Sequence, residues 1–259
     1  MPRSAFRNPF ERTPQPLHIV VVIPARYHST RFPAKPLADI AGRSMLEHVY
    51  ERATAAPDVD AVVVATDDAR IAQAVERFGG LVRMTRSTHR SGLDRIAEVA
   101  ADLDCDIVVN VQGDEPLLEP KMIAEVVAPI DSDPTLRMST LRRRISDPAD
   151  SGNPHVVKVV VDLEGNALYF SRSAVPFVRD TTVPLFKHVG LYAYRRTFVC
   201  ELASLPQTPL EISESLEQLR AIEHGFRIRA IETHYDSIGV DTPEDLERVR
   251  RQMTVGTRA

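Results

Sequence analysis

Strand-like and helix-like patterns alternate through the first half of the chain, and this alternation constrains the possible folds more than any other feature. Three short apolar runs have the composition of strands that are buried on both faces: residues 19–23, 61–65 and 106–111. Helix-like patterns lie between or after these runs, centred on residues 45–53, 71–75, 96–103 and 120–127. Because strands that alternate with helices usually pair in parallel, the sequence predicts an α/β fold with a mostly parallel sheet.

The pattern changes after about residue 136, where strand-like runs follow one another without long helices between them. These runs are residues 138–145, 156–161, 167–171 and 189–194. We therefore expect antiparallel pairing and a smaller mixed α/β lobe at about 136–195. Two helices should follow, one at about 213–224 with Gly225 as its C-cap, and a last one with Thr242 as N-cap and Pro243 in its first turn.

Length, charge and cysteine spacing exclude several classes of function. The 259 residues suit a single domain over 17–259, and the net charge of -4 gives no general attraction to nucleic acid or to an anionic membrane. Residues 1–16 contain three arginines but no apolar signal segment, so we expect a disordered extension; an organellar transit peptide is the alternative. No apolar run is long enough to cross a bilayer, and the two cysteines have no zinc-site spacing, so we expect a cytoplasmic protein.

The loop after the first strand-like run concentrates positive charge where ligands bind in open α/β sheets, beyond the carboxyl ends of the strands. Residues 23–37 include Arg26, Arg31 and Lys35 together with three prolines. Arginine forms bidentate hydrogen bonds and lysine is a compact point charge, so the three cations could hold a triphosphate. A solvated basic loop is the alternative. The chain has neither the dinucleotide glycine fingerprint nor a Walker A loop.

Two aspartates stand at the ends of predicted elements, one after a strand and one before a helix. Asp114 follows the run at 106–111, and Mg²⁺ is often held by one or two carboxylates together with substrate phosphates. A turn or a helix cap is the alternative role for Asp114. Asp241 comes just before the last predicted helix and by itself looks like a loop acid near a helix dipole. Sequence spacing alone does not pair it with Asp114.

In this order, the segments resemble those of the 3-deoxy-manno-octulosonate (Kdo) cytidylyltransferases over about residues 17–253. Residues 23–37 contain the Pro-Ala-Arg-Tyr, Ser-Thr-Arg and Lys-Pro-Leu elements of that family, and residues 112–116 resemble its metal-binding motif. The related sialic-acid enzymes have a glycine-rich loop instead. One departure is Ala34, where the family usually has glycine; its methyl group could crowd the loop or demand a negative φ.

The resemblance implies roles for particular side chains. The catalytic residues would be Arg26, Lys35 and Asp114, and the Mg²⁺ ligands would be Asp114 and Asp241. The nucleotide-binding residues would be Pro24, Ala25, Arg26, Ser29, Arg31, Lys35, Ser91 and Gly92. The sugar-acid contacts would be Gln112, His188, Tyr192, Glu217 and Gln218. Alternatives remain for the last two groups: a plain helix start at Ser91, packing roles for His188 and Tyr192, and a solvated helix face for Glu217 and Gln218.

The resemblance also implies a nucleotide-diphospho-sugar transferase-like (Rossmann-like) fold and a Mg²⁺-dependent homodimer. The reaction would transfer CMP from CTP to the anomeric hydroxyl of Kdo for lipopolysaccharide biosynthesis, releasing pyrophosphate. No nucleic acid or membrane partner is expected. A sialic-acid or 8-amino-Kdo cytidylyltransferase and a non-catalytic nucleotide-binding regulator stay open as alternatives. The missing glycine fingerprint argues against a nicotinamide dehydrogenase on a similar sheet.

Overall fold

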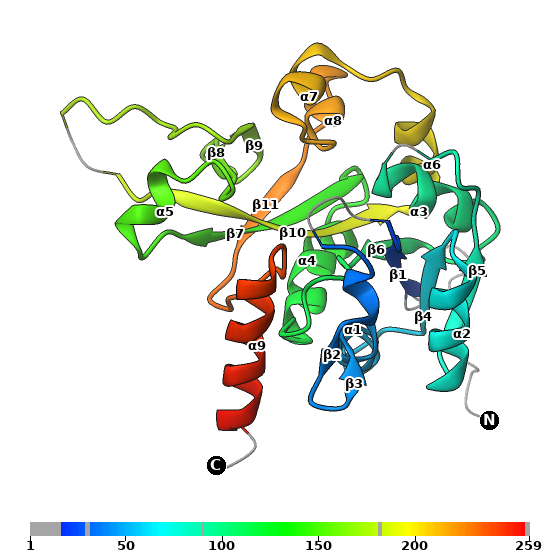
Figure 1. Cartoon of the computed structure of the whole chain (residues 1–259). Coiled ribbons are helices and arrows are strands. Elements are labelled where there is room, and N and C mark those ends of the chain that lie inside the picture. Colours follow the sequence, from blue (N-terminus) through cyan, green and yellow to red (C-terminus); the bar gives the residue numbers. More distant parts are fainter. Residues whose placement is uncertain (1–16, 29–31, 90, 181–182, 257–259) are drawn as a thin grey trace, which may run out of the picture.

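The fold is built around one nine-stranded sheet. The structure is a computed structural model that describes residues 17–28, 32–89, 91–180 and 183–256. The strand order is β11-β7-β10-β6-β1-β4-β5, and β8 and β9 branch from β10 (Figure 1). The strands are β1 Ile19–Ala25, β4 Ala61–Thr66, β5 Leu81–Met84, β6 Ile107–Asn110, β7 Met138–Arg144, β8 Lys158–Val161, β9 Ala167–Ser171, β10 Phe186–Arg195 and β11 Arg229–Glu232. Strands β1, β4, β5 and β6 pair in parallel, so the predicted α/β class is confirmed.

Helices cover both faces of the sheet. They are α1 Met45–Thr54, α2 Ala69–Arg77, α3 Gly92–Ala101, α4 Lys121–Ser132, α5 Pro148–Gly152, α6 Arg196–Ser204, α7 Pro209–Glu214, α8 Leu219–Glu223 and α9 Pro243–Gly256. A short 3-10 helix, η1 (Lys35–Leu37), and the small hairpin β2 (Asp39–Ile40) and β3 (Arg43–Ser44) precede α1. None of the helices in the described ranges is both long and apolar enough to span a membrane.

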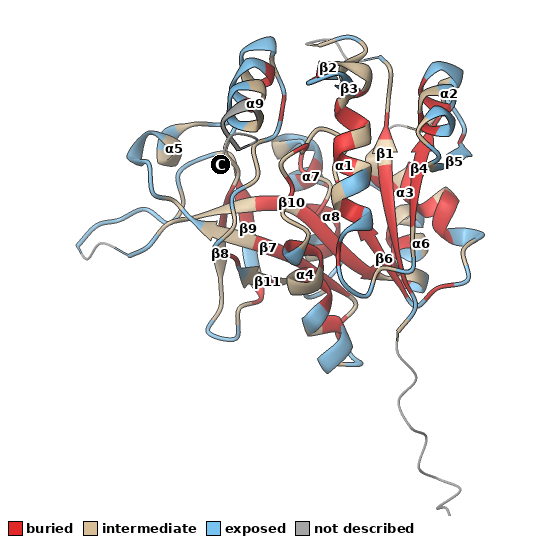
Figure 2. Ribbon diagram, turned by 90° about the horizontal axis from the view of Figure 1, so that it is seen from below, coloured by how far each residue is buried: buried red, intermediate tan, exposed pale blue. Residues whose placement is uncertain are grey.

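The first strand shows why its sequence pattern is a continuous apolar run. Ile19, Val21 and Ile23 pack in one core with α1, α2 and α4, whereas Val20 and Val22 pack in a second core with α3 and α6. Successive side chains of a strand point to opposite faces, so a strand with helices on both sides must be apolar at every position. Figure 2 shows this strand buried between the helix layers.

Two predicted helix starts are confirmed by their capping hydrogen bonds. Ser91 Oγ accepts from the backbone N of Asp94 at 3.1 Å, and the Asp94 carboxylate accepts from the Ser91 backbone N at 3.2 Å. Thr242 and Asp245 form the same reciprocal pair at the start of α9. Each pair satisfies two backbone groups that a helix N-terminus otherwise leaves open.

The single helix predicted at 213–224 is wrong. The segment forms two short helices, α7 and α8, because Ser215 adopts a left-handed conformation with φ 52° that ends the first helix. Leu216 and Leu219 are both buried, so the apolar spacing continues across the break and conceals it in the sequence. The expected C-cap at Gly225 has a positive φ of 82°, as a left-handed helix end requires.

The segment expected to form a lobe divides between two places. Strands β7 and β10 pair with each other inside the main sheet, and β10 also pairs with β6. Strands β8 and β9 form the antiparallel branch, with Gly165 at φ 83° in the turn between them. The antiparallel pairing predicted for this region is therefore confirmed, while the lobe boundaries at 136–195 stay a prediction.

Ala34 adopts φ 58° and ψ 19°, so the expectation that its methyl group demands a negative φ is wrong. A left-handed conformation costs an alanine roughly 1–2 kcal/mol, and the extra freedom that glycine gives the unfolded chain offsets about 0.4–1 kcal/mol of that. Ala34→Gly should therefore raise the free energy of unfolding by about 0.5 kcal/mol in chemical denaturation. The control, Ala38→Gly at φ -60°, should lower it; a loss of stability in both variants would contradict the account.

Candidate active site

The two distant acidic segments converge on the lysine of the phosphate loop. Lys35 Nζ donates to Asp114 Oδ2 at 2.6 Å and to Asp241 Oδ1 at 3.3 Å. Asp114 lies in the turn after β6, and Asp241 directly precedes the N-cap residue of α9. The backbone N of Val240 also donates to the carbonyl oxygen of Asp114 at 2.9 Å. The fold thus joins two carboxylates that sequence spacing could not pair.

The packing of the last helix explains this convergence. Val240, Leu246 and Val249 form a small core with Ile40 of β2 and Met45 of α1. Both β2 and α1 follow η1 closely in the chain. The C-terminal segment is therefore held beside the phosphate loop by apolar contacts, and Asp241 is placed next to Lys35 as a result.

Lys35 behaves as a cation fixed between two anions. Burial alone would lower the pKa of its ammonium group, but the ion pairs and hydrogen bonds with Asp114 and Asp241 outweigh burial and raise it. The ammonium group therefore stays charged near neutral pH. Its position shows that the two carboxylate oxygens can hold one positive charge between them, which is what a divalent cation would require of the same donors.

The pair of carboxylates around Lys35 allows a test of whether Mg²⁺ fits the site. Mg²⁺ prefers oxygen ligands and commonly combines one or two carboxylates with substrate phosphates and water. Within the described ranges, no group of three or more His, Cys, Asp or Glu side chains could hold a metal ion. The residues therefore fit Mg²⁺ that is bound jointly by this carboxylate pair and a phosphate-bearing substrate, and the donor chemistry gives no reason to expect a closed protein site.

The end of β1 lies against the turn that carries Asp114. Pro24 and Ala25 are the last residues of β1, and Arg26 follows them with a half-buried side chain. A Cβ added to Gly113 would lie 3.1 Å from the carbonyl oxygen of Pro24, so any other residue there would require this backbone to shift slightly. Gly92 at the start of α3 is also near, with an added Cβ 3.9 Å from Pro24 Cγ.

The predicted contacts of Ser29 and Arg31 lie outside the described residues. The described nucleotide-binding candidates, from β1, η1 and the start of α3, all border the carboxyl edge of the sheet. That is where an α/β sheet binds ligands.

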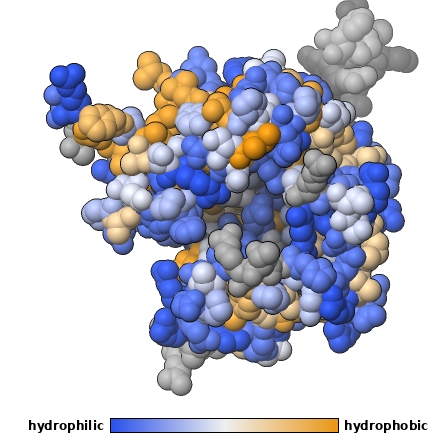
Figure 3. All heavy atoms as spheres, turned by 45° about the horizontal axis from the view of Figure 1, so that its top comes forward, coloured by the Kyte–Doolittle hydropathy of each residue, from blue (hydrophilic) through white to orange (hydrophobic). Residues whose placement is uncertain are grey.

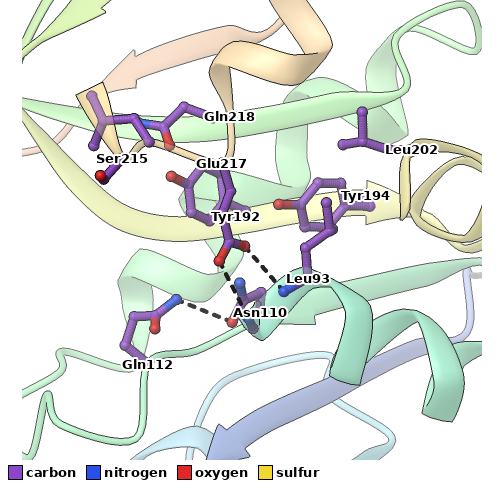
Figure 4. Close-up of a pocket in the computed structure, with 11 residues that line it drawn as sticks. Leu93, Asn110, Gln112, Tyr192, Tyr194, Leu202, Ser215, Glu217 and Gln218 are labelled. Atoms are coloured by element: carbon purple, nitrogen blue, oxygen red, sulfur yellow. Dashed lines mark hydrogen bonds between the residues drawn. The ribbon is translucent and has the colours of Figure 1, made fainter. Parts of the chain in front are cut away.

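A cavity of about 240 Å³ opens beside this edge, and Figure 4 shows its lining. Four of the predicted sugar-acid contacts line it together: Gln112, Tyr192, Glu217 and Gln218. They come from the turn after β6, from β10 and from the segment between α7 and α8. The molecule is hollowed near the middle of the face seen in Figure 3, and hydrophilic residues surround much of this hollow.

Glu217 closes one side of the cavity by reaching the start of α3. Its carboxylate accepts from the backbone N of Gly92 at 3.2 Å and of Leu93 at 3.0 Å (Figure 4). Burial raises the pKa of Glu217, and the two backbone hydrogen bonds only partly oppose this. The backbone N–H of Gly92, a residue predicted to bind the nucleotide, is thus bonded to a side chain of the same molecule.

Gln218 is the clearest polar group without a protein partner in the cavity. Its side chain is only 5% exposed, and among the described residues its Nε2 has no hydrogen-bond partner. A buried amide donor that stays unpaired costs about 1–3 kcal/mol, so such a group points to a ligand that would satisfy it.

His188 does not join the other predicted sugar-acid contacts. It lines a neighbouring cavity of about 640 Å³, which also includes Asp241. Its Nε2 is 2.9 Å from Thr140 Oγ1, and its ring packs between Phe170 and Tyr192. Burial lowers the pKa of His188 to about 3, so the ring is neutral near physiological pH. The contact with Phe170 and the hydrogen bond with Thr140 hold the His188 ring in the larger cavity, so that Tyr192 lies between His188 and the smaller cavity.

Two further polar residues of the site had no role of their own assigned from the sequence. Asn110 at the end of β6 is 5% exposed, lines the smaller cavity and accepts a hydrogen bond from Gln112 Nε2 at 3.3 Å. A polar residue near the end of an apolar strand run was the available signal. Glu115 lines the larger cavity, and burial, with a further contribution from the charge of Asp114, raises its pKa to about 7.

Comparison with known proteins supports the fold and the family resemblance. A family model described as Cytidylyltransferase matches residues 20–230. The 3-deoxy-manno-octulosonate cytidylyltransferase of Geobacter sulfurreducens is 56% identical over 249 residues, covering 92% of this chain and 100% of the relative. The enzyme of the same name from Solibacter usitatus is 55% identical over 238 residues, covering 91% and 94%.

Solved structures with a similar fold include an enzyme that, by its name, carries out the same kind of cytidylyl transfer. The structure of CMP:2-keto-3-deoxy-manno-octonic acid synthetase complexed with CTP superposes with a TM-score of 0.88 at 46% identity, covering 92% of this chain and 99% of that one. A 4-diphosphocytidyl-2C-methyl-D-erythritol synthase from Anaerococcus prevotii, 13% identical with a TM-score of 0.59 over 92% and 96% of the two chains, shares the fold. By the family match and by identity over nearly the full length of its relatives, this chain belongs to the 3-deoxy-manno-octulosonate cytidylyltransferase family.

Proposed function

We propose that this chain transfers CMP from CTP to the anomeric hydroxyl of Kdo, releasing pyrophosphate and forming CMP-Kdo for lipopolysaccharide biosynthesis. The observation that carries the proposal is the position of Lys35 between Asp114 and Asp241, at the ligand-binding edge of the sheet. The identity of 56% to a relative named for this activity supports it, as does the likeness to a synthetase complexed with CTP.

Asp114 and Asp241 would hold Mg²⁺ together with oxygens of the nucleotide phosphates. The bound ion would neutralise phosphate charge and lower the pKa of a coordinated hydroxyl. Lys35 would then leave the carboxylates for a phosphate oxygen, because the metal would replace its charge there. Arg26 at the end of β1 would neutralise charge that develops on the phosphates, and Arg31 would hold the nucleotide or the leaving pyrophosphate.

The reaction itself requires mainly positioning and charge stabilisation. The anomeric oxygen of the sugar acid forms a bond to the α-phosphorus, the bond from that phosphorus to the bridging oxygen breaks, and pyrophosphate leaves with the electron pair. The hydroxyl proton passes to solvent. We assign no side chain as general base, and Pro24, Ala25, Ser29, Ser91 and Gly92 would form the nucleotide wall.

The smaller cavity would hold the sugar acid, with Gln112, Tyr192, Glu217 and Gln218 as its polar contacts. His188 would act from the other side of Tyr192, by holding that ring in place. The neutral side chains of Gln112, Tyr192 and Gln218 suit the hydroxyl groups of a sugar, and burial raises the pKa of Tyr192, so its hydroxyl remains a hydrogen-bond donor.

Gln218→Leu should raise the KM for Kdo about 10-fold and leave the KM for CTP nearly unchanged, because it removes one buried hydrogen bond to the sugar. Steady-state kinetics with each substrate varied in turn would measure both values. Gln73→Leu on the exposed face of α2 is the control and should leave both constants unchanged. An unchanged KM for Kdo in Gln218→Leu would remove this residue from the sugar site.

A homodimer in the cytoplasm is part of the proposal. Large apolar side chains are exposed on and near the β8–β9 branch: Leu163, Leu168 and Phe177. Apolar groups gathered in one region commonly mark a protein interface. Sedimentation velocity should show a dimer; a monomer at all concentrations up to the micromolar range used in the assays would contradict this part.

The test of the function is pyrophosphate release with CTP, Mg²⁺ and Kdo. UTP and ATP in place of CTP should give little release, and omission of Kdo should abolish it. Sialic acid and 8-amino-Kdo offered in competition would separate the alternative sugar acids. Binding of CTP without any pyrophosphate release would contradict the proposal and favour a nucleotide-binding regulator.

A further inference from the structure

Arg70 of α2 lies against the tyrosine at the base of the phosphate loop. Its guanidinium carbon is 3.3 Å from the centroid of the Tyr27 ring, within the range of a cation–π contact. Tyr27 directly follows Arg26, and its carbonyl oxygen accepts a hydrogen bond from the backbone N of Ala34 at 3.0 Å. Tyr27 therefore stands where the two ends of the loop meet, between Arg26 on one side and Lys35 on the other.

Asp68 holds Arg70 in this position. Its carboxylate accepts from Arg70 Nε at 2.9 Å and from Nη2 at 2.6 Å, and it also accepts from the backbone N of Arg70 at 2.9 Å as the N-cap of α2. Hydrogen bonding to Arg70 lowers the pKa of Asp68 to about 2, so the carboxylate is ionised throughout the neutral range. A bidentate pair fixes the plane of the guanidinium group while its carbon lies over the ring.

The contact between Arg70 and Tyr27 is not part of the hydrophobic core. The Arg70 side chain is 54% exposed, whereas the Tyr27 ring is partly buried against the core that contains β1. An exposed cation above one face of a tyrosine adds little to global stability, but it limits where the ring and the adjoining backbone can lie. Arg26 directly precedes Tyr27, so a restraint on the ring also limits the backbone from which the Arg26 side chain extends.

We propose that Arg70 is a positioning residue for the phosphate loop, acting through the face of Tyr27 on the backbone that presents Arg26 to the nucleotide. This inference rests on the proposed function, since it assigns the loop to CTP. It predicts that the restraint favours CTP binding and that the sugar-acid cavity, which these residues do not line, is unaffected.

The experiment compares Arg70→Ala, Arg70→Lys, Tyr27→Leu, Tyr27→Phe and the double variant Arg70→Ala with Tyr27→Leu. Arg70→Ala should raise both the KM for CTP and the calorimetric Kd for CTP about two- to fivefold, with kcat and the KM for Kdo less affected. Arg70→Lys should recover part of the loss because an ammonium group also interacts with the ring, and Tyr27→Phe should behave like the wild type. Arg77→Ala at the exposed end of α2 is the control and should change neither constant.

The double variant decides between two ways in which Arg70 could act. If Arg70 acts through the ring, the double variant is no worse than Tyr27→Leu alone. Effects that multiply would instead show that the guanidinium group contacts CTP directly, and would overturn the proposal, as would an unchanged Kd in Arg70→Ala. The calorimetric Kd needs no turnover, so a wild-type chain that binds CTP without releasing pyrophosphate would refute the proposed function and still test this inference. Thermal unfolding of each variant would identify any loss of Kd that comes from misfolding.

Discussion

Asp114→Asn should lower kcat about 100- to 1000-fold while it changes the Kd for CTP far less. The substitution keeps the size of the side chain and removes the charge that pairs with Lys35 at 2.6 Å. An amide oxygen is a weaker ligand for Mg²⁺ than a carboxylate, so charge on the reacting phosphates would be less well neutralised. Most of the affinity for CTP should survive, because other residues hold the nucleotide. Pyrophosphate release and isothermal titration calorimetry would measure the two quantities.

Glu244→Gln is the matched control for this prediction. Glu244 lies in the first turn of α9, close in sequence to Asp241, and it is exposed. Glu244→Gln removes one negative charge, as Asp114→Asn does, so a general effect of charge on nucleotide binding would appear in both variants. If Asp114→Asn turns over as fast as the wild type, Asp114 is not a catalytic residue. If both variants lose kcat equally, the effect of Asp114→Asn is a nonspecific effect of charge.

Arg220→Met should lower the free energy of unfolding by about 3–5 kcal/mol, the range for breaking a buried ion pair by removing one partner. Arg220 donates to the Glu211 carboxylate from Nε at 2.8 Å and from Nη2 at 2.5 Å, and each of these two side chains is only 3% exposed. Methionine fills much of the space but leaves a carboxylate without its cation. Urea denaturation followed by circular dichroism would measure the loss.

Two further variants separate this pair from ordinary surface charges. Arg43→Met breaks an exposed pair with Glu51 and should cost less than about 1 kcal/mol. Adding Glu211→Met to Arg220→Met should recover part of the loss, because it removes the unpaired buried charge. A cost for Arg220→Met as small as that for Arg43→Met would show that the α7–α8 connection does not depend on the buried pair. Since Glu217 and Gln218 lie between these helices, a loosened connection should also raise the KM for Kdo.

The sequence was most informative where function and local structure use the same residues. Continuous apolar runs predicted the central strands, because a strand covered on both faces is apolar at nearly every position; polar Asn110 stands at the end of β6, beside the cavity. The helix start expected at Ser91 is confirmed, and its capping bonds with Asp94 span only four residues, so the signal is local. Lys35 and Asp114 follow buried strands at the edge where ligands bind, but position alone left a solvated loop and a turn as alternatives, and their roles were implied by the family resemblance.

Features that depend on the path of the whole chain could not be predicted in this way. The meeting of Asp241 with Asp114 is produced by apolar packing of α9 on β2 and α1, which no local pattern records. The break at Ser215 was concealed because the buried leucines on either side keep helical spacing. No local pattern indicated that the Glu217 carboxylate accepts hydrogen bonds from two backbone amides of α3, which are more than 120 positions away in sequence.

The central claim is that Asp114 and Asp241 share one divalent cation with the phosphates of CTP. The most direct measurement is a crystal structure of the protein with CTP and Mn²⁺, in which anomalous scattering locates the metal. We expect one metal peak coordinated by a carboxylate oxygen of each aspartate and by phosphate oxygens, with Lys35 moved from the carboxylates to the triphosphate. A metal bound elsewhere, or CTP bound with Lys35 still between the two aspartates, would contradict the account.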